Sequence, residues 1–326
     1  MGHHLASITK ALASARLMVA FFLLMAGAAL AVAHELVEPT PAALFPLGLL
    51  FLNLTASIVS NARFRADFPL LIFHVALLAF VALLAVARLT YFQGVAKVPV
   101  GARFTGEMQK AERGALHGDG PTSVRFSNEG FIEVHPAHNN FRRTQNHVRF
   151  PDAHGNIHEG MIGDDRPLVL DGYRIYTTSN RGFVPMLQWT GEDDSIQFAS
   201  LLLGKVQDDG FTPGMAWSIP SGPQVWVSLS TERMVLTPGT QRHNLGAKEA
   251  SNKLVLRHNE QFYDLKAGES VELPGGRLTY TGLSAWMGYS IIYDPTMPWL
   301  VGTISIAVAS LLWFYARRLW RTWDED

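Results

Sequence analysis

Residues 70–86 read LLIFHVALLAFVALLAV, an apolar run whose single ionisable residue is His74. A hydrocarbon core about 30 Å thick needs roughly 20 apolar residues in a helix, so this run predicts a membrane-spanning helix. Three similar runs accompany it: 17–33 (LMVAFFLLMAGAALAVA), 45–60 (FPLGLLFLNLTASIVS) and 299–316 (WLVGTISIAVASLLWFYA). The sequence therefore predicts a membrane protein with four spans, three near the N-terminus and one near the C-terminus.

Positively charged residues flank these spans on one side. They are Lys10, Arg16, Arg63, Arg65, Arg317, Arg318 and Arg321, whereas the segment 34–42 between the first two spans has none. Lysine and arginine concentrate in cytoplasmic loops, so both termini and the 61–69 loop are expected in the cytoplasm. We therefore expect a cytoplasmic N-terminus (1–16), three spans (17–89), an extracytoplasmic domain (90–297), and a fourth span with a cytoplasmic tail (298–326).

The first span also allows another interpretation. A basic start, an apolar run and Ala31-Val32-Ala33 ahead of His34 are typical of a cleavable signal peptide. The topology of the remaining chain is the same in both cases. We expect a retained anchor.

The domain between the third and fourth spans is predicted to be all-β. Short β-rich runs alternate with glycine, proline, asparagine and aspartate, and no long stretch has a helical period. Expected strands lie in 123–134, 169–177, 225–229, 254–256 and 277–280, with turns at 152–156, 171–172 and 274–276. About 200 residues suffice for a closed core, which favours a sandwich or an open barrel. The segment 101–122 is expected to be an irregular connection.

The composition argues against several classes of partner and of catalytic chemistry. Lys and Arg total 27 against 28 Asp and Glu, which gives no reason to expect a nucleic-acid partner. There is no cysteine, so the chain has no disulfide, no thiolate ligand and no cysteine nucleophile. Neither a Walker loop nor a G-x-S-x-G motif is present.

Several polar clusters are assigned to loops. Five histidines crowd into 24 residues: His135, His138, His147, His154 and His158. His154 and His158 have a spacing that binds metal on a helix, but the turn expected at 152–156 would not bring them onto one face. The acid pairs Asp164-Asp165 and Asp193-Asp194 are interpreted as solvated turns rather than as an acid and a base.

His74 is the main candidate functional residue. It lies roughly five residues into the third span, about 7 Å below the cytoplasmic surface at 1.5 Å per residue. An ionisable residue at membrane depth is costly and suggests function, and a neutral imidazole is a common axial ligand of haem iron. The alternative is a histidine that hydrogen-bonds a neighbouring helix and holds no cofactor. Arg63 and Arg65 could pair with haem propionates or could serve only as topological anchors.

Three stretches together resemble the ResB (CcsB) family, the membrane subunit of System II cytochrome c maturation. They are FPLLIFHVALLAFVALLAVARLTYFQGVAKVPVGARF (68–104), DRPLVLDGYRIYTTSNRGFVP (165–185) and AGESVELPGGRLTYTGLSAWMGYSIIYDPTMPWLVG (267–302). They occur in the family's order and within its layout of three spans, a large β domain and a closing span. The chain departs from the family in being short, and it lacks the tryptophan-rich haem-handling motif of the partner subunit CcsA.

The resemblance implies a function. It implies a standalone subunit of a cytochrome c synthase in a bacterial inner membrane, with its β domain in the periplasm. His74 would hold haem b together with a ligand from a CcsA-like partner, and apocytochrome c would be the substrate. Because thioether attachment uses cysteines of the apocytochrome, the chain is not expected to be a self-sufficient enzyme.

Two other functions remain open. The protein could be a membrane-anchored scaffold whose β domain binds another protein without a cofactor. It could also be a haem-b electron carrier in a larger respiratory complex. His74 is the one histidine suitably placed in the predicted spans, so a bis-histidine site would again need a partner.

Overall fold

A computed structural model describes residues 9–323, apart from 138–142, 153, 164, 208–211, 232–235, 237 and 249–250. The chain forms two compact units, each described by itself below. One contains the long helices together with residues 112–120, and the other contains most of the strands. The predicted fold class is confirmed, because the chain combines four candidate membrane-spanning helices with a large β-rich domain.

The four spans are α2 (Ala15–Ala33), α3 (Pro39–Ser60), α5 (Phe68–Thr90) and α6 (Met297–Trp323), and the short α4 (Ala62–Ala66) links α3 to α5. Each is long and apolar enough to cross a bilayer. α3 begins six residues earlier than the apolar pattern predicts. Its extra first turn carries Pro39, which is compatible with a first helical turn because its missing N–H needs no partner there.

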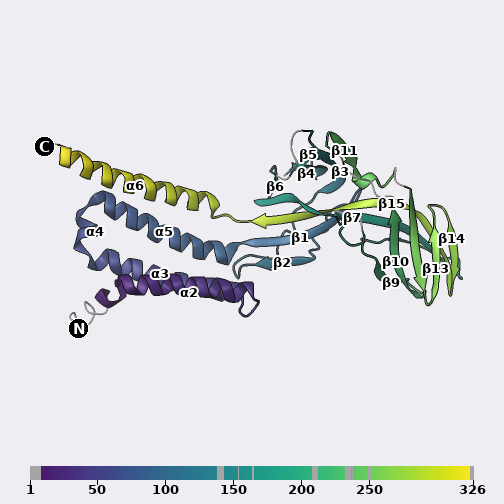
Figure 1. Cartoon of the computed structure of the whole chain (residues 1–326), viewed down its shortest axis with the longest axis horizontal. Helices are drawn as coiled ribbons and strands as arrows, with labels where there is room; N and C mark the ends of the chain where they lie inside the picture. The colour runs from purple at the N-terminus through teal and green to yellow at the C-terminus, as the bar shows by residue number, and fades with distance from the viewer. Residues whose placement is uncertain are drawn as a thin grey trace. The chain divides into compact units, whose positions relative to one another are not determined.

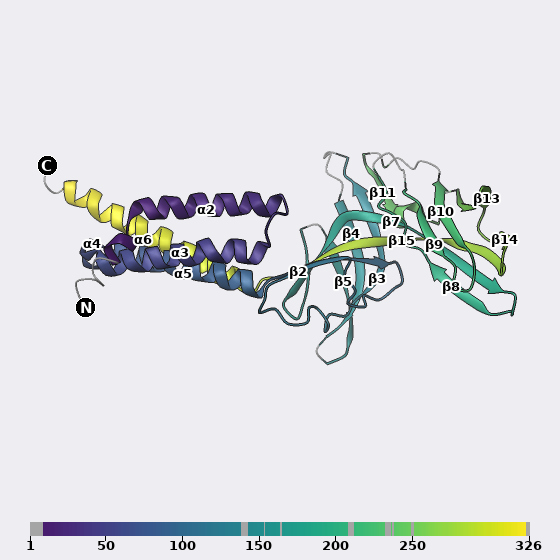
Figure 2. The same cartoon turned by 90° about the horizontal axis from the view of Figure 1, so that it is seen from below.

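The helices pack in chain order, α2 on α3, α3 on α5 and α5 on α6 (Figures 1 and 2). Leu47, Leu50 and Val81 form the buried contact between α3 and α5. At the end of the bundle near α4, the ring of Phe68 lies edge-on to that of Trp313, with centroids 6.1 Å apart. Arg317 of α6 lies 3.8 Å from Asp67 at the same end.

The β-rich unit contains three antiparallel sheets. The largest follows the order β2-β1-β15-β7-β6, with β14 paired to β15 and β8 paired to β7. Its strands are β1 (Phe92–Pro99), β2 (Lys110–Arg113), β6 (Leu168–Leu170), β7 (Tyr173–Gly191), β8 (Ile196–Ser200), β14 (Ser270–Leu273) and β15 (Gly276–Tyr293). The second has the order β11-β3-β4-β5, formed by β3 (Ser127–His135), β4 (Arg143–Pro151), β5 (Ile157–Gly163) and β11 (Thr240–His243). The third has the order β13-β12-β10-β9, formed by β9 (Met215–Ser218), β10 (Gln224–Thr231), β12 (Asn252–His258) and β13 (Gln261–Leu265).

Strands β7 and β15 form the longest pair and carry much of the core (Figure 1). Trp189, Trp286 and Tyr289 on these strands are fully buried. The sequence predicts β15 only over 277–280, whereas the strand continues to Tyr293, and its residues 285–289 are buried on both faces.

The three predicted turns are confirmed. Residues 152–156 connect β4 to β5, and Gly155 N donates a hydrogen bond to Asp152 O at 3.0 Å. Asp171 and Gly172 connect β6 to β7 with φ of 50° and 82°, the positive values that a two-residue hairpin of this kind requires. Pro274 and Gly275 connect β14 to β15.

The segment 101–122 is largely irregular, as predicted, but it contains β2. Its residues 112–120 belong to the helical unit, where Gly114 N donates to Tyr91 O at 2.9 Å. A Cβ at Gly114 would lie 2.2 Å from Leu89 O, so only glycine allows this close approach. The expected 90–297 domain is therefore interrupted by a segment that packs on the end of α5.

Candidate functional site

His74 lies in the first third of α5, six residues after the helix begins at Phe68. At 1.5 Å per residue this is about 9 Å along the helix axis. Apolar residues surround it in sequence, and its side chain is half-buried against other helices. His74 is the only histidine within the four long helices, so any imidazole chemistry inside the spans depends on it.

The hydrogen bonding of His74 defines which ring nitrogen carries the proton. Nδ1 lies 2.7 Å from the backbone carbonyl oxygen of Leu70, one turn earlier in α5. A carbonyl only accepts, so Nδ1 must be the protonated donor. In the neutral imidazole this leaves Nε2 with the lone pair that binds a metal. The same arrangement orients metal-ligating histidines in proteins, where the second ring nitrogen donates to a backbone carbonyl.

Two phenylalanines hold the ring of His74. Phe64 of α4 stacks on it with centroids 3.9 Å apart and an interplanar angle of 23°. Phe73 lies edge-on to it at 5.2 Å. Together with the bond to Leu70, these contacts restrict the rotation of the imidazole.

His74 lines a cavity of about 580 Å³ inside the helical unit. The lining side chains come from the N-terminal segment and from α2, α3, α4 and α5. They are Lys10, Ala13, Ala15, Met18, Asn53, Leu54, Ser57, Ser60, Asn61, Ala62, Phe64 and His74. Both apolar and polar groups are present, which suits a ligand with an apolar body and polar edges.

Asn53 fixes the N-terminal segment beside this cavity. Its buried amide nitrogen donates to Leu12 O at 2.5 Å and to Ser14 O at 3.2 Å. Such bonds between membrane helices are typical of polar residues at span interfaces. Asn53 of the second span therefore anchors one wall of the cavity.

The basic residues near His74 lie on α4 and in the N-terminal segment. Arg63 and Arg65 are exposed on α4, and neither forms an ion pair with a described residue. Lys10, which the sequence suggests only as a topological signal, is the cation among the cavity's lining residues. An anionic group bound beside His74 would meet Lys10 in the cavity wall.

The histidine cluster of the β unit is dispersed. Within the described part of the chain, no group of three or more histidine, aspartate or glutamate side chains has the geometry to hold a metal ion. His154 lies in the β4–β5 turn and His158 in β5, where its Nε2 lies 3.0 Å from Asp152 Oδ2. That contact and two backbone N–H donors hold the pKa of Asp152 well below its usual range. His138 lies outside the described residues.

The acid pairs have the features of turns. Asp193 accepts hydrogen bonds from both the hydroxyl and the backbone N–H of Ser195, which lowers the pKa of its carboxyl. Asp194 has a positive φ of 59° in the same turn between β7 and β8. Asp164 lies outside the described residues, and Asp165 is exposed.

His117 is a residue that sequence reasoning missed. It lies in the segment that folds back on the end of α5, and its Nδ1 lies 2.9 Å from Thr90 O. Its ring stacks on Phe92 and lies edge-on to Tyr293, each with centroids 5.1 Å away. No local pattern marks it, because its neighbours come from two segments that are distant from it in the sequence.

The chain was compared with known proteins. No protein-family model matches it, and no curated protein matches it either.

Proposed function

We propose that this protein is a haem-handling membrane subunit of cytochrome c maturation. It would lie in a bacterial cytoplasmic membrane, with the β unit on the outer side. A CcsA-like subunit would be its partner, and apocytochrome c the acceptor of the haem. This proposal rests on the family resemblance of three stretches and on the geometry at His74.

The observation that carries the proposal is the set of contacts that the His74 ring makes. Its Nδ1–H donates to Leu70 O at 2.7 Å, its face is covered by Phe64, and it borders a cavity of about 580 Å³. A histidine that served only to link helices would direct its hydrogen bond to a neighbouring helix. This bond is made within α5 instead, so Nε2 remains for a ligand.

The chain supplies a single intramembrane imidazole, and a bis-histidine haem needs two. The second axial ligand would therefore come from the partner subunit. Haem contributes the iron, which takes an axial nitrogen, and two propionates, which need cationic or polar contacts. Lys10 is the better placed cation, while Arg63 and Arg65 could reach a propionate only near the exposed face of α4.

The proposed orientation is supported by the gathering of positive charge at one end of the helical unit. Lys10 lines the cavity there, Arg63 and Arg65 lie on α4, and Arg317 lies 3.8 Å from Asp67. By the positive-inside rule, this end faces the cytoplasm. Haem would then meet His74 from the inner side.

The test is a visible spectrum of the full chain purified in detergent and titrated with haem. The wild type should give a Soret band, and His74→Ala should lose it. His117→Ala is a matched control, because it removes another half-buried histidine of the same unit whose Nδ1 also lies near a backbone carbonyl. His154→Ala is a second control in an exposed turn.

A further variant separates ligation from folding. His74→Gly should regain a shifted Soret band when free imidazole is added, because the small ligand can occupy the space left by the ring. A wild-type protein that stays colourless with haem, or a His74→Ala protein whose spectrum matches the wild type, would contradict the proposal.

A second candidate, the membrane-anchored scaffold, is favoured by one surface of the β unit. Trp226, Arg257 and Phe262 are directly opposed across β10, β12 and β13, and all three are exposed. Exposed aromatic side chains in a row are typical of protein-binding surfaces. If the wild type binds no haem, loss of a co-purifying protein in Trp226→Ser/Phe262→Ser would support the scaffold.

A further inference from the structure

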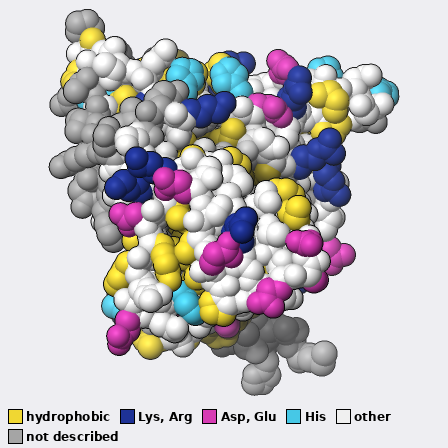
Figure 3. All heavy atoms as spheres, turned by 90° about the vertical axis from the view of Figure 1, so that its right-hand side faces the viewer, with side chains coloured by type: hydrophobic (Ala, Val, Ile, Leu, Met, Phe, Trp, Pro, Cys, Tyr) yellow, Lys and Arg dark blue, Asp and Glu magenta, His cyan; other side chains and the backbone are white. Residues whose placement is uncertain are grey.

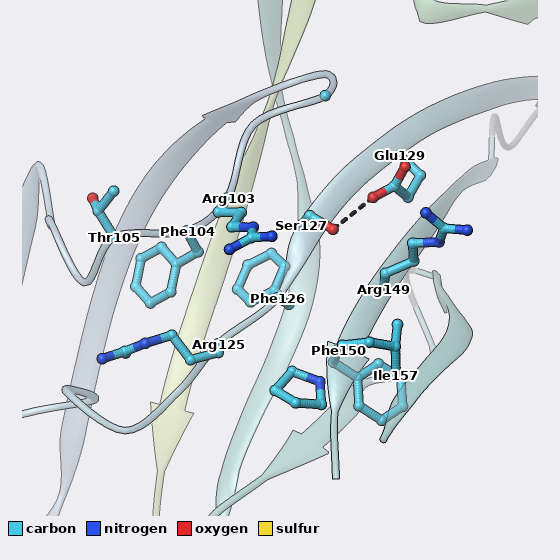
Figure 4. Close-up of a pocket in the computed structure, with 12 residues that line it drawn as sticks. Arg103, Phe104, Thr105, Arg125, Phe126, Ser127, Glu129, Arg149, Phe150 and Ile157 are labelled. Carbon is cyan, nitrogen blue, oxygen red and sulfur yellow. Dashed lines mark hydrogen bonds between the residues drawn. The ribbon is translucent and has the colours of Figure 1, made fainter. Parts of the chain in front are cut away.

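The β unit contains a cavity of about 730 Å³ that the proposed haem site does not involve. It lies where the loop 101–105 passes the start of β3 and the β4–β5 hairpin (Figure 4). Its size falls within the range of about 300–1,000 Å³ that is typical of small-molecule sites.

The wall of this cavity combines arginines with apolar rings. Phe104 and Phe126 stack with centroids 5.2 Å apart and an interplanar angle of 22°. The backbone N–H of Phe104 donates to Phe126 O at 2.8 Å, and both side chains are almost completely buried. The two rings are therefore held in place. Phe150 and Ile157 provide apolar surface on the other side (Figure 4).

Positive charge dominates the lining. Three arginines, Arg103, Arg125 and Arg149, face one acid, Glu129. On the face of the molecule in Figure 3, by contrast, acidic and basic side chains are interspersed. Glu159 pairs with Arg149 from outside the lining, so three cations face two acids and the cavity favours an anion.

The three arginines differ in how they are held. Arg125 is fixed by its Nη1, which donates to Thr122 O at 2.5 Å and Val124 O at 2.9 Å. Arg149 donates through Nε to Glu159 at 3.1 Å. Arg103 makes no ion pair or side-chain hydrogen bond with a described residue, so its whole guanidinium is available.

Glu129 does not compete for these cations. Its carboxylate accepts a hydrogen bond from the hydroxyl of Ser127 at 2.6 Å, and no ion pair joins it to an arginine among the described residues (Figure 4). An incoming carboxylate can therefore pair with guanidinium groups in bidentate geometry.

We infer that this cavity binds a small amphipathic anion, namely an organic carboxylate with a flat apolar body. The body packs against Phe126, Phe150 and Ile157, and the carboxylate pairs with Arg103 and Arg149. This ligand site is independent of His74 and of haem.

The test uses naphthalene-2-carboxylate as the probe and its uncharged amide as the comparison, both measured by equilibrium dialysis against the full chain in detergent. A detergent-only cell corrects for partition into micelles. The wild type should bind the carboxylate saturably and at least about tenfold more tightly than the amide, because charge-assisted pairs are lost in the amide.

Variants locate the site. Arg103→Gln/Arg149→Gln should weaken carboxylate binding at least about tenfold. Arg277→Gln is the matched control, because it removes an exposed arginine that, like Arg149, pairs with a glutamate through its Nε, and its strand β15 contributes no residue to the cavity. His74→Ala should bind the probe as the wild type does, which distinguishes this inference from the proposed function.

Three outcomes would overturn the inference. They are equal affinity for carboxylate and amide, a double variant that binds like Arg277→Gln, and absence of saturable binding to the wild type. Far-ultraviolet circular dichroism of each variant confirms that a loss of binding is not a loss of fold.

Discussion

The Glu133 side chain is only 1% exposed, yet it carries a carboxylate. Its two oxygens each lie 2.5 Å from a guanidinium nitrogen, one of Arg181 on β7 and one of Arg242 on β11. A buried charge is tolerated only when it is paired in this way. At the scale of the residue, the buried Asn146 of β4 also has a partner on a distant strand, since its Oδ1 accepts a hydrogen bond from the hydroxyl of Tyr289 at 2.8 Å.

Tyr280 gives a pH-dependent prediction at this scale. It is fully buried, and burial raises its pKa to about 12. Between pH 10 and 12 the unfolded chain ionises this phenol while the folded chain does not, so stability is complete below pH 10 and is lost as pH rises toward 12. The contribution over this range is about 2–3 kcal/mol, at 1.36 kcal/mol per unit.

The measurement is urea unfolding of the full chain in detergent at several pH values, followed by tryptophan fluorescence. Tyr280→Phe should show a shallower loss of stability above pH 10 than the wild type. Tyr263→Phe, at a half-exposed position in β13, should keep the wild-type slope. Identical slopes in all three proteins would show that Tyr280 does not titrate in this way.

At the scale of elements, the turns of the β unit depend on glycine where the backbone has a positive φ. Gly276 begins β15 with φ of 155°, and a Cβ there would lie 2.2 Å from Thr190 O. Gly268 has φ of 90°, but nothing lies within 4 Å of its hypothetical Cβ. A side chain at Gly268 would therefore lose stability only through its backbone conformation, whereas a side chain at Gly276 would also clash with Thr190.

Substitution by alanine at these positions tests that separation. Gly268→Ala should cost about 1–2 kcal/mol, the penalty for a left-handed conformation. Gly276→Ala should cost about 3 kcal/mol or more, because the β7–β15 pair must also move apart. Urea unfolding of both variants measures the difference, and equal losses would contradict the clash.

At the scale of the whole molecule, the order of the spans predicts that α4 and the β unit lie on opposite sides of the membrane. Residue 62 lies in α4 between the second and third spans, and residue 123 lies in the β unit between the third and fourth. An odd number of spans separates them, so they must lie on opposite sides of the membrane if α5 crosses it.

Because the chain has no cysteine, a single cysteine substitution can report on which side of the membrane a residue lies. Ser123→Cys, at an exposed position, should react with a membrane-impermeant maleimide added to intact spheroplasts. Ala62→Cys, also exposed, should react only after the membrane is permeabilised. Labelling of Ala62→Cys alone in intact spheroplasts would reverse the proposed orientation.

The spans, the β-rich unit and the turns could be predicted from the sequence alone. These features depend on local properties, since a run of apolar residues is long enough to cross a bilayer wherever it occurs, and Asp171-Gly172 forms a tight hairpin without help from distant residues. His74 became a candidate for the same kind of reason, because it is an ionisable side chain inside an apolar run. The start of α3, at residues 39–44, and the extent of β15 were predicted less well, because the local sequence pattern is ambiguous there.

The surroundings of these residues could not be predicted in this way. Phe64 on His74, Lys10 in the cavity wall, the folding of His117 onto Phe92, and the arginine-lined cavity all depend on segments that are distant in the chain. Hydrophobic periodicity specifies which face of an element is buried but not which element covers it. The environment of a candidate site follows from packing, and packing is a property of the folded chain.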